Sequence, residues 1–218
     1  MTRNFLAAAQ FLTRVPIRLR TAPDLAAAVP WFPVVGALIG AAVGLVAAGL
    51  TEVIPSSVAA AIAIIVGLLH EDGLADTADA LGGMTPERRR EILKDSRHGS
   101  YGVAAMCTTI VLRIICVASL GPAAAFAGLV AAHTLGRGAA VAAMVTGRPA
   151  AHKGLGADYT RVLSRRSAAV GVLAALAIGA LVGGWWVGPL ALAVAVGAAA
   201  VIRLAHRSFG GISGDLLG

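Results

Sequence analysis

Long apolar stretches separated by short polar segments dominate the sequence and limit the chain to a membrane fold. Crossing a hydrocarbon core of roughly 30 Å takes about 20 helical residues. We expect six crossings, at residues 33–53, 56–70, 102–120, 122–146, 167–187 and 188–205. The second is short, so it either extends into the polar residues that follow or re-enters on one side. The sequence predicts an all-α, polytopic helical bundle that forms a single membrane-embedded domain over residues 1–218.

Composition supports this fold class and removes one class of partner. Only 13% of the residues are charged, and the mean hydropathy is +0.83, both far from an ordinary soluble domain. The formal net charge is +7, but the basic residues lie in connections between apolar stretches, where they set membrane orientation. The charge therefore does not indicate a nucleic-acid partner.

Basic residues alternate between the connections. The N-terminal region, the 71–101 and 147–166 loops and the C-terminal tail carry Lys and Arg, whereas the connections near Glu52, Gly121 and Gly188 carry none. Positively charged loops stay in the cytoplasm. We therefore expect a multi-pass protein of the cytoplasmic (inner) membrane, with its polar loops and any active site facing the cytoplasm.

Residues 1–20 have the spacing of an amphipathic helix. The apolar residues Phe5, Ala8, Ala9, Leu12 and Val15 fall on one face. Such a helix suits the membrane interface, so we predict an N-terminal interfacial helix.

A few polar or reactive residues interrupt the apolar stretches. Cys107 and Cys116 lie in one stretch and are most simply buried packing residues. Arg113 and Arg137 are costly inside a bilayer unless they have a partner, which makes each a candidate for function or for an ion pair. His133 precedes Arg137 by four residues, so the two share a helix face.

An acidic segment follows the second apolar stretch directly. Four of the eleven acidic residues fall there: Glu71, Asp72, Asp76 and Asp79. The three aspartates are spaced i, i+4 and i+7, so on a helix their carboxylates share one face, while Glu71 points away. Close carboxylates repel unless a cation or a proton intervenes. Mg²⁺ prefers oxygen ligands and often bridges carboxylates to phosphates, so the pattern favours a metal site over a solvated helix start.

Two further polar clusters lie on the same predicted side. Lys94, Asp95, Ser96 and Arg97 precede a turn at Gly99, and their cations, carboxylate and flexible backbone suit a metal-bound diphosphate. The run Arg88–Arg90 is read as charge that fixes orientation. The tail, residues 210–218, is rich in glycine and carries Asp215, which could complete a metal site or belong to a frayed end. His70 is a candidate contact to substrate or to a metal ligand.

Together these segments resemble the adenosylcobinamide-GDP ribazoletransferase family, also called cobalamin-5′-phosphate synthase. The resemblance rests on the stretches Gln10–Pro16 and Phe32–Gly36, on the H-x-D-G-L-A-D-x-x-D pattern from His70 to Asp79, on Lys94–Gly102 and on Gly210–Gly218. They occur in the family's order over essentially the whole chain. Glu71 stands where the family usually has Leu, and Ala80 where it usually has Gly. Family members also commonly continue beyond the tail motif into another hydrophobic segment, which the resemblance implies is missing from these 218 residues.

The resemblance implies a reaction. Such enzymes transfer the cobinamide-phosphate group of adenosylcobinamide-GDP to α-ribazole or its 5′-phosphate and release GMP, which leads to vitamin B12. Mg²⁺ is the expected cofactor. Association with other cobalamin-assembly enzymes, or a homo-oligomer, is left open.

The resemblance also assigns roles to residues of this chain. Three sets follow. The metal ligands are expected to be Asp72, Asp76, Asp79 and Asp95, with Asp95 or Asp215 as the alternatives for a general base. The diphosphate is expected to be held by Lys94 and Arg97. The further substrate contacts are expected to be His70, Ser96, Gly99, Tyr101, Arg137, Gly210, Gly211 and Asp215.

Two other functions would share some of these features. A CDP-alcohol phosphotransferase also carries an Asp-Gly-x-x-Ala stretch, but it continues with Arg where this chain has Asp76 and has a later D-x-x-x-D pair that is missing here. A transporter would also bury charges, but it would not need three polar clusters on one side, and no inverted repeat is evident.

Overall fold

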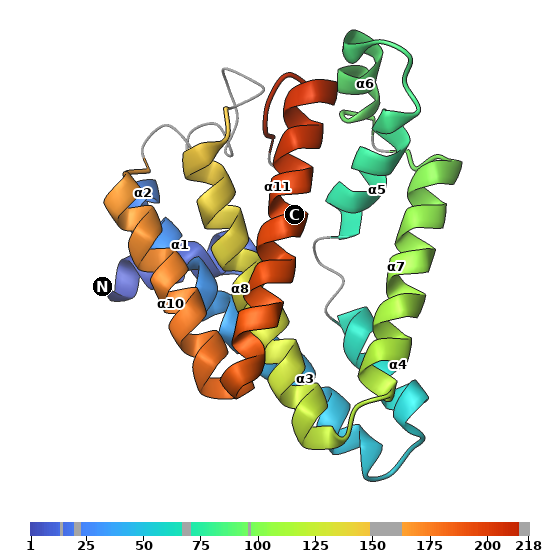
Figure 1. The fold of residues 1–218 in the computed structure, drawn as a ribbon, viewed down its shortest axis with the longest axis vertical. Helices are drawn as coiled ribbons and strands as arrows, with labels where there is room; N and C mark the ends of the chain where they lie inside the picture. Colours follow the sequence, from blue (N-terminus) through green and yellow to red (C-terminus); the bar gives the residue numbers. More distant parts are fainter. Residues whose placement is uncertain (14, 20–22, 67–70, 96, 149–162, 214–218) are drawn as a thin grey trace.

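A computed structural model describes residues 1–13, 15–19, 23–66, 71–95, 97–148 and 163–213, and every secondary-structure element among them is a helix (Figure 1). In chain order these are α1 (Thr2–Leu12), α2 (Leu25–Ala28), η1 (Val29–Trp31), α3 (Phe32–Thr51), α4 (Ser56–Val66), α5 (Glu71–Leu81), α6 (Pro86–Ile92), α7 (Ser100–Ala118), α8 (Pro122–Thr146), α10 (Arg165–Gly183), η3 (Gly184–Trp186) and α11 (Val187–Ser208). The all-α prediction is confirmed.

The predicted crossings correspond to helices. Four helical runs are long and apolar enough to span a membrane, at Ala26–Thr51, Ser100–Ala118, Pro122–Thr146 and Arg165–Ser208. The last run contains two predicted crossings, because η3 interrupts it and α10 and α11 lie side by side (Figure 1). A shorter apolar helix, α4, covers Ser56–Val66 of the predicted second crossing, and residues 67–70 lie outside the described residues. The chain is therefore a helical membrane protein.

The helices form two groups that are joined by packing between α3 and α4. In one group, α8 packs against α3, α10 and α11; in the other, α7 packs against α4 and α5. Figure 1 shows α6 and the ends of α8 and α11 at one end of the molecule, with the α3–α4, α7–α8 and α10–α11 connections at the other. The end with these three connections carries no Lys or Arg in residues 51–56, 119–122 and 183–189. The first end, which we call the basic end, carries Arg88–Arg90, Arg97 and Arg148.

Three glycines of α3 allow its close contact with α8. Gly36, Gly40 and Gly44 follow one another at four-residue intervals, and all three are buried. A Cβ added at Gly40 would lie 2.6 Å from the carbonyl oxygen of Leu129 and 2.7 Å from Cα of Val130. Small residues at such positions let membrane helices approach until their backbones touch. This contact builds the scaffold of the first group.

The N-terminal helix α1 is part of the protein core. Ala7, Ala8 and Leu12 are buried in a cluster with Val29 and Phe32. Ala8 and Leu12 belong to the predicted apolar face, so the predicted helix is confirmed for Thr2–Leu12. It ends before Val15, which was predicted on the same face and is exposed. Its placement at a membrane interface stays a prediction.

The prediction of buried cysteines is wrong. Cys107 and Cys116 are free thiols on exposed positions of α7, and Arg113 is exposed on the same helix. The reason is that α7 contacts mainly α4 and α5, which leaves most of its surface outside the protein core. Apolar residues there are suited to lipid, so hydrophobicity alone did not indicate burial.

The chain after α11 turns back and packs against α5. Gly210 has φ +80°, in the left-handed region that glycine reaches without steric cost. The Ile212 amide then donates to the Arg148 carbonyl at 2.7 Å. Phe209 and Ile212 share a buried cluster with Ala80 of α5. The tail therefore joins the acidic helix to the ends of α8 and α11.

Candidate active site

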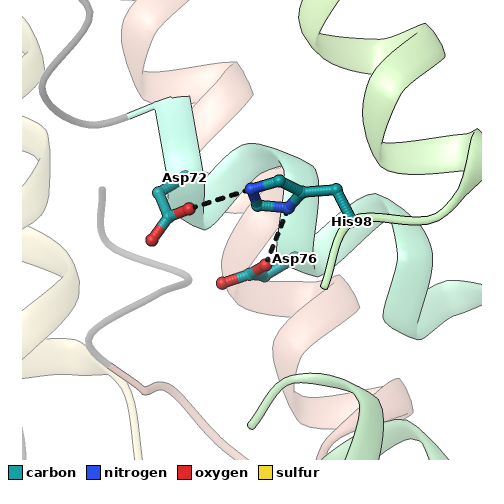
Figure 2. A group of neighbouring side chains, drawn as sticks. All are labelled: Asp72, Asp76 and His98. Carbon is teal, nitrogen blue, oxygen red and sulfur yellow. Dashed lines mark ion pairs between the residues drawn. The ribbon is translucent and has the colours of Figure 1, made fainter. Parts of the chain in front are cut away.

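The predicted acidic segment forms helix α5 at the basic end. Asp72 and Asp76 are one turn apart and project from the same side of α5 (Figure 2). Ala75 and Ala80 are fully buried, and α5 packs along α7. The small apolar residues therefore face the protein, and the helical spacing sets the carboxylates apart from them.

His98, just before α7, lies between two of the aspartates. Its Nε2 is 3.4 Å from Oδ1 of Asp72, and its Nδ1 is 3.5 Å from Oδ1 of Asp76 (Figure 2). These distances are longer than those of good hydrogen bonds. The side chain of Asp76 is 15% exposed and that of Asp72 is 76% exposed. One side of the group is thus sheltered, and the Asp72 side is open to an incoming molecule.

The third aspartate has a different environment. Asp79 accepts two backbone hydrogen bonds, from Gly99 N–H to Oδ2 at 2.6 Å and from Gly102 N–H to Oδ1 at 2.8 Å. Its oxygens are thus directed at the start of α7. It lies outside the group formed by Asp72, Asp76 and His98.

The predicted cluster at 94–97 forms an ion pair. Arg97 donates from Nε to Oδ1 of Asp95 at 3.0 Å and from Nη2 to Oδ2 at 2.8 Å. This hydrogen-bonded guanidinium lowers the pKa of Asp95 from 3.8 to about 2. Asp95 is therefore ionised at neutral pH, and a carboxylate with so low a pKa is a weak general base. In this structure it orients Arg97 instead of joining the metal group.

The other basic side chains near α6 differ in whether they already have a hydrogen-bond or ion-pair partner. Each arginine of α6 has a nearby partner: Arg88 pairs with Glu91 at 2.9 Å, Arg90 pairs with Glu87 at 3.3 Å, and Arg89 donates from Nε to the Gly83 carbonyl at 2.8 Å. By contrast, Lys94 is exposed and makes no ion pair with any residue that the structure describes. Lys94 is therefore the cation of this segment best placed to receive an anion.

Several predicted substrate contacts lie elsewhere or have structural roles. Arg137 lies on α8, where its Nη1 is 3.2 Å from Nδ1 of His133 and its side chain passes Gly36 of α3. Tyr101 is 69% exposed, and its ring lies beside Gly82 at the end of α5. Gly210 and Gly211 form the turn after α11. Gly99 is the N-cap of α7 and donates its N–H to Asp79. The other three, His70, Ser96 and Asp215, lie outside the described residues.

His98 was missed by the sequence reasoning. It lies in the Lys94–Gly102 stretch, and no regular spacing connects it to the aspartates. Its separation by 22 residues from Asp76 is bridged only by the fold. A histidine next to a glycine-rich turn that follows an acidic helix is the one signal that could have suggested it.

The group fits a divalent cation. One ligand atom from each of Asp72, Asp76 and His98 lies within 4.8 Å of the other two. Ligands of one octahedral ion at about 2.1 Å are roughly 3.0 to 4.2 Å apart, so a small closure would suffice. Two carboxylates suit Mg²⁺ or Mn²⁺, and the imidazole also suits Mn²⁺ and later transition metals.

Comparison with known proteins identifies the family. The model of the cobalamin-5-phosphate synthase family matches residues 4–218. The chain belongs to this family. An adenosylcobinamide-GDP ribazoletransferase of Ralstonia nicotianae is 37% identical over 99% of this chain and 89% of the relative. One of Bradyrhizobium diazoefficiens is 40% identical over the same shares. The comparison with solved structures found no match.

Membership in the cobalamin-5-phosphate synthase family decides between the alternatives drawn from the sequence. The match spans the helices of both groups, the acidic helix and the tail. The family match supports neither the CDP-alcohol phosphotransferase nor the transporter interpretation.

Proposed function

We propose that this chain is a membrane transferase that joins adenosylcobinamide-GDP to α-ribazole or α-ribazole 5′-phosphate and releases GMP. The observation that carries the proposal is the Asp72–Asp76–His98 group at the basic end of a chain of this family. In the reaction, a ribose hydroxyl oxygen forms a bond to the phosphorus attached to cobinamide. The bond from that phosphorus to the GMP oxygen breaks, and the hydroxyl proton leaves to a base or to solvent.

The metal role is proposed for the three grouped side chains. Asp72, Asp76 and His98 would hold Mg²⁺, which supplies charge neutralisation to diphosphate oxygens when bound. The open Asp72 side is where substrate oxygens would approach, because Asp76 is sheltered by the fold. With a metal bound, helix α5 and the loop before α7 would hold these ligands in place, which would reduce the reorganisation needed during catalysis.

Lys94 and Arg97 are proposed to bind the diphosphate. Lys94 is exposed, and the side chain of Arg97 is 87% exposed although one edge of its guanidinium is paired with Asp95. A planar guanidinium held along one edge still presents N–H donors along the other. Asp95 would thus fix the direction of Arg97, and Asp215 remains the proposed alternative for the base.

We place this site on the cytoplasmic side of the inner membrane. The basic end carries the acidic helix and the described arginines of the connecting loops, while residues 51–56, 119–122 and 183–189 at the opposite end carry no Lys or Arg. The positive-inside rule orients such a bundle with its basic end in the cytoplasm. The corrinoid and the nucleoside would then arrive from the cytosol, with the apolar helices in the bilayer.

The test of this function is product formation by membranes that contain the chain. Adenosylcobinamide-GDP and α-ribazole 5′-phosphate are supplied together, and GMP and the corrinoid product are measured by chromatography. We expect the two products in equal amounts. If verified, inserted protein releases neither product, the proposed reaction is wrong.

Asp95→Asn is expected to weaken substrate binding without changing the pH profile. Loss of the carboxylate charge frees Arg97, so the KM for adenosylcobinamide-GDP should rise several-fold with a smaller change in kcat. The pKa of Asp95 is about 2, below its ordinary value, so the pair is intact above about pH 4 and is lost only as the pH falls toward that value. The pH–rate curve between roughly pH 5 and 9 should therefore keep its shape. Loss of the acidic limb in Asp95→Asn would show that Asp95 titrates in turnover.

A further inference from the structure

We propose that Asp79 is a positioning residue: from α5 its carboxylate binds backbone amides at the start of α7 and so ties the backbone beside His98 to α5, which holds His98 against Asp72 and Asp76. This inference rests on the proposed function, because that function makes His98 a metal ligand whose position matters. It also differs from the ligand role expected for Asp79 from the sequence. The structure supports it through hydrogen bonds, steric fit and chain connectivity.

The hydrogen bonds form a helix cap supplied by another helix. The N-cap of α7 is Gly99, which has no side chain to accept the free amides of the first turn. Asp79 accepts from Gly102, the third residue of α7, which is the bond a Ser or Asp at the N-cap would make. It also accepts from Gly99 itself, as the acidic partner of a capping box does. One carboxylate from α5 thus replaces both parts of a local cap.

The two glycines provide room for this carboxylate. At Gly99, the three heavy atoms nearest to an added Cβ all belong to Asp79, with Oδ1 at 2.7 Å. Gly99 has φ −93°, which any residue can adopt, so its own backbone does not demand glycine. An added Cβ at Gly102 would meet Asp79 and would lie 2.7 Å from the Ala75 carbonyl. The spacing of glycines in this motif is therefore explained by the approach of Asp79.

The peptide bond between His98 and Gly99 connects the Asp79 hydrogen bond to the Asp72–Asp76–His98 group. His98 is joined by one peptide bond to Gly99, whose amide is held by Asp79 at 2.6 Å. Asp79 and Asp76 are on the same short helix, so this bond fixes the backbone of His98 relative to Asp76. The contacts of the His98 ring to the aspartates, at 3.4 and 3.5 Å, are too long to hold it firmly by themselves. Asp79 provides the firmer link.

The test separates positioning from capping and from direct metal ligation. Three variants are compared with the wild type in detergent: Asp79→Ala, Asp79→Ala with Gly99→Ser, and Asp79→Ala with Gly99→Ala. Without the Asp79 carboxylate, Gly99→Ser has room and provides a local N-cap, whereas the matched Gly99→Ala does not. Mn²⁺ alone is the probe. Its affinity, the coupling of a histidine nitrogen in its electron spin-echo spectrum, and Tm are measured.

The expected result has three parts. Asp79→Ala lowers Tm by a few degrees, weakens Mn²⁺ binding roughly tenfold or more, and removes the nitrogen coupling. Gly99→Ser in that background restores Tm relative to Gly99→Ala, yet neither the affinity nor the coupling returns. His98→Gln in the otherwise wild-type chain also removes the coupling, which assigns the nitrogen to His98.

Three results would overturn the proposal. Recovery of affinity and coupling together with Tm would reduce Asp79 to a helix cap. Weaker binding with the nitrogen coupling retained would make Asp79 a direct ligand. A wild type without the coupling would show that His98 is not held at the metal. GMP release by the wild type is measured separately, so any of these outcomes is distinguishable from failure of the proposed reaction.

Discussion

Asp72→Ala is expected to reduce GMP release by roughly a thousandfold while the protein still inserts and folds. The side chain is 76% exposed, so its removal leaves no buried gap. A metal ion commonly contributes several kcal/mol of transition-state stabilisation, and each 1.36 kcal/mol is about tenfold in rate. Losing one of three protein ligands removes most of that contribution. The measurement is single-turnover GMP release at saturating substrate.

The matched control for this variant is Glu87→Ala. Glu87 is also an exposed acid at the basic end, where it pairs with Arg90 at 3.3 Å. A surface pair three residues apart on a helix contributes only a few tenths of a kcal/mol. The control should therefore keep nearly full activity. Near-normal turnover by correctly inserted Asp72→Ala protein would remove Asp72 from the metal site.

Gly40→Ala is expected to cause a large loss of stability from a single methyl group. The new Cβ would be 2.6 Å from the Leu129 carbonyl and 2.7 Å from Cα of Val130, and both are backbone atoms of α8 that cannot rotate away. The two helices must then separate along their contact. We expect a loss of about 3 kcal/mol, the upper end of the usual cost of overpacking. The measurement is thermal unfolding in detergent.

Gly49→Ala on the same helix is the control. An added Cβ at Gly49 has no atom within 4 Å. Alanine also favours the helix by about 1 kcal/mol relative to glycine, so this variant should unfold at or above the wild-type temperature. Equal effects at the two positions would contradict the close α3–α8 packing.

Much of the fold could be predicted because apolar stretches must satisfy their backbone polar groups inside a bilayer. This requirement alone indicated the helices that became α3, α7 and α8. It could not indicate which helices pack together or which helix surfaces face lipid, because lipid and the protein interior are equally apolar. Cys107 illustrates the limit: it was expected to be buried and is exposed on α7.

The site was predicted in part. Helical spacing correctly joined Asp72 and Asp76, since residues four apart share a face. The same spacing also included Asp79, but the turn after α6 brings the start of α7 to that carboxylate, and no local pattern encodes this approach. His98 enters the group for the same reason. Contacts across about 20 residues depend on how α5 and α7 pack, which is a property of the fold.

We propose that Asp72, Asp76 and His98 hold a divalent cation that the transfer requires. It is tested most directly by treating purified protein with EDTA, returning Mg²⁺ or Mn²⁺ in steps, and measuring GMP release from adenosylcobinamide-GDP and α-ribazole 5′-phosphate. We predict that activity disappears with EDTA and returns with either metal, and that His98→Ala needs at least about tenfold more metal for half-maximal activity. Full activity in EDTA would show that the transfer needs no divalent cation. An unchanged metal requirement in His98→Ala would show that His98 is not a ligand.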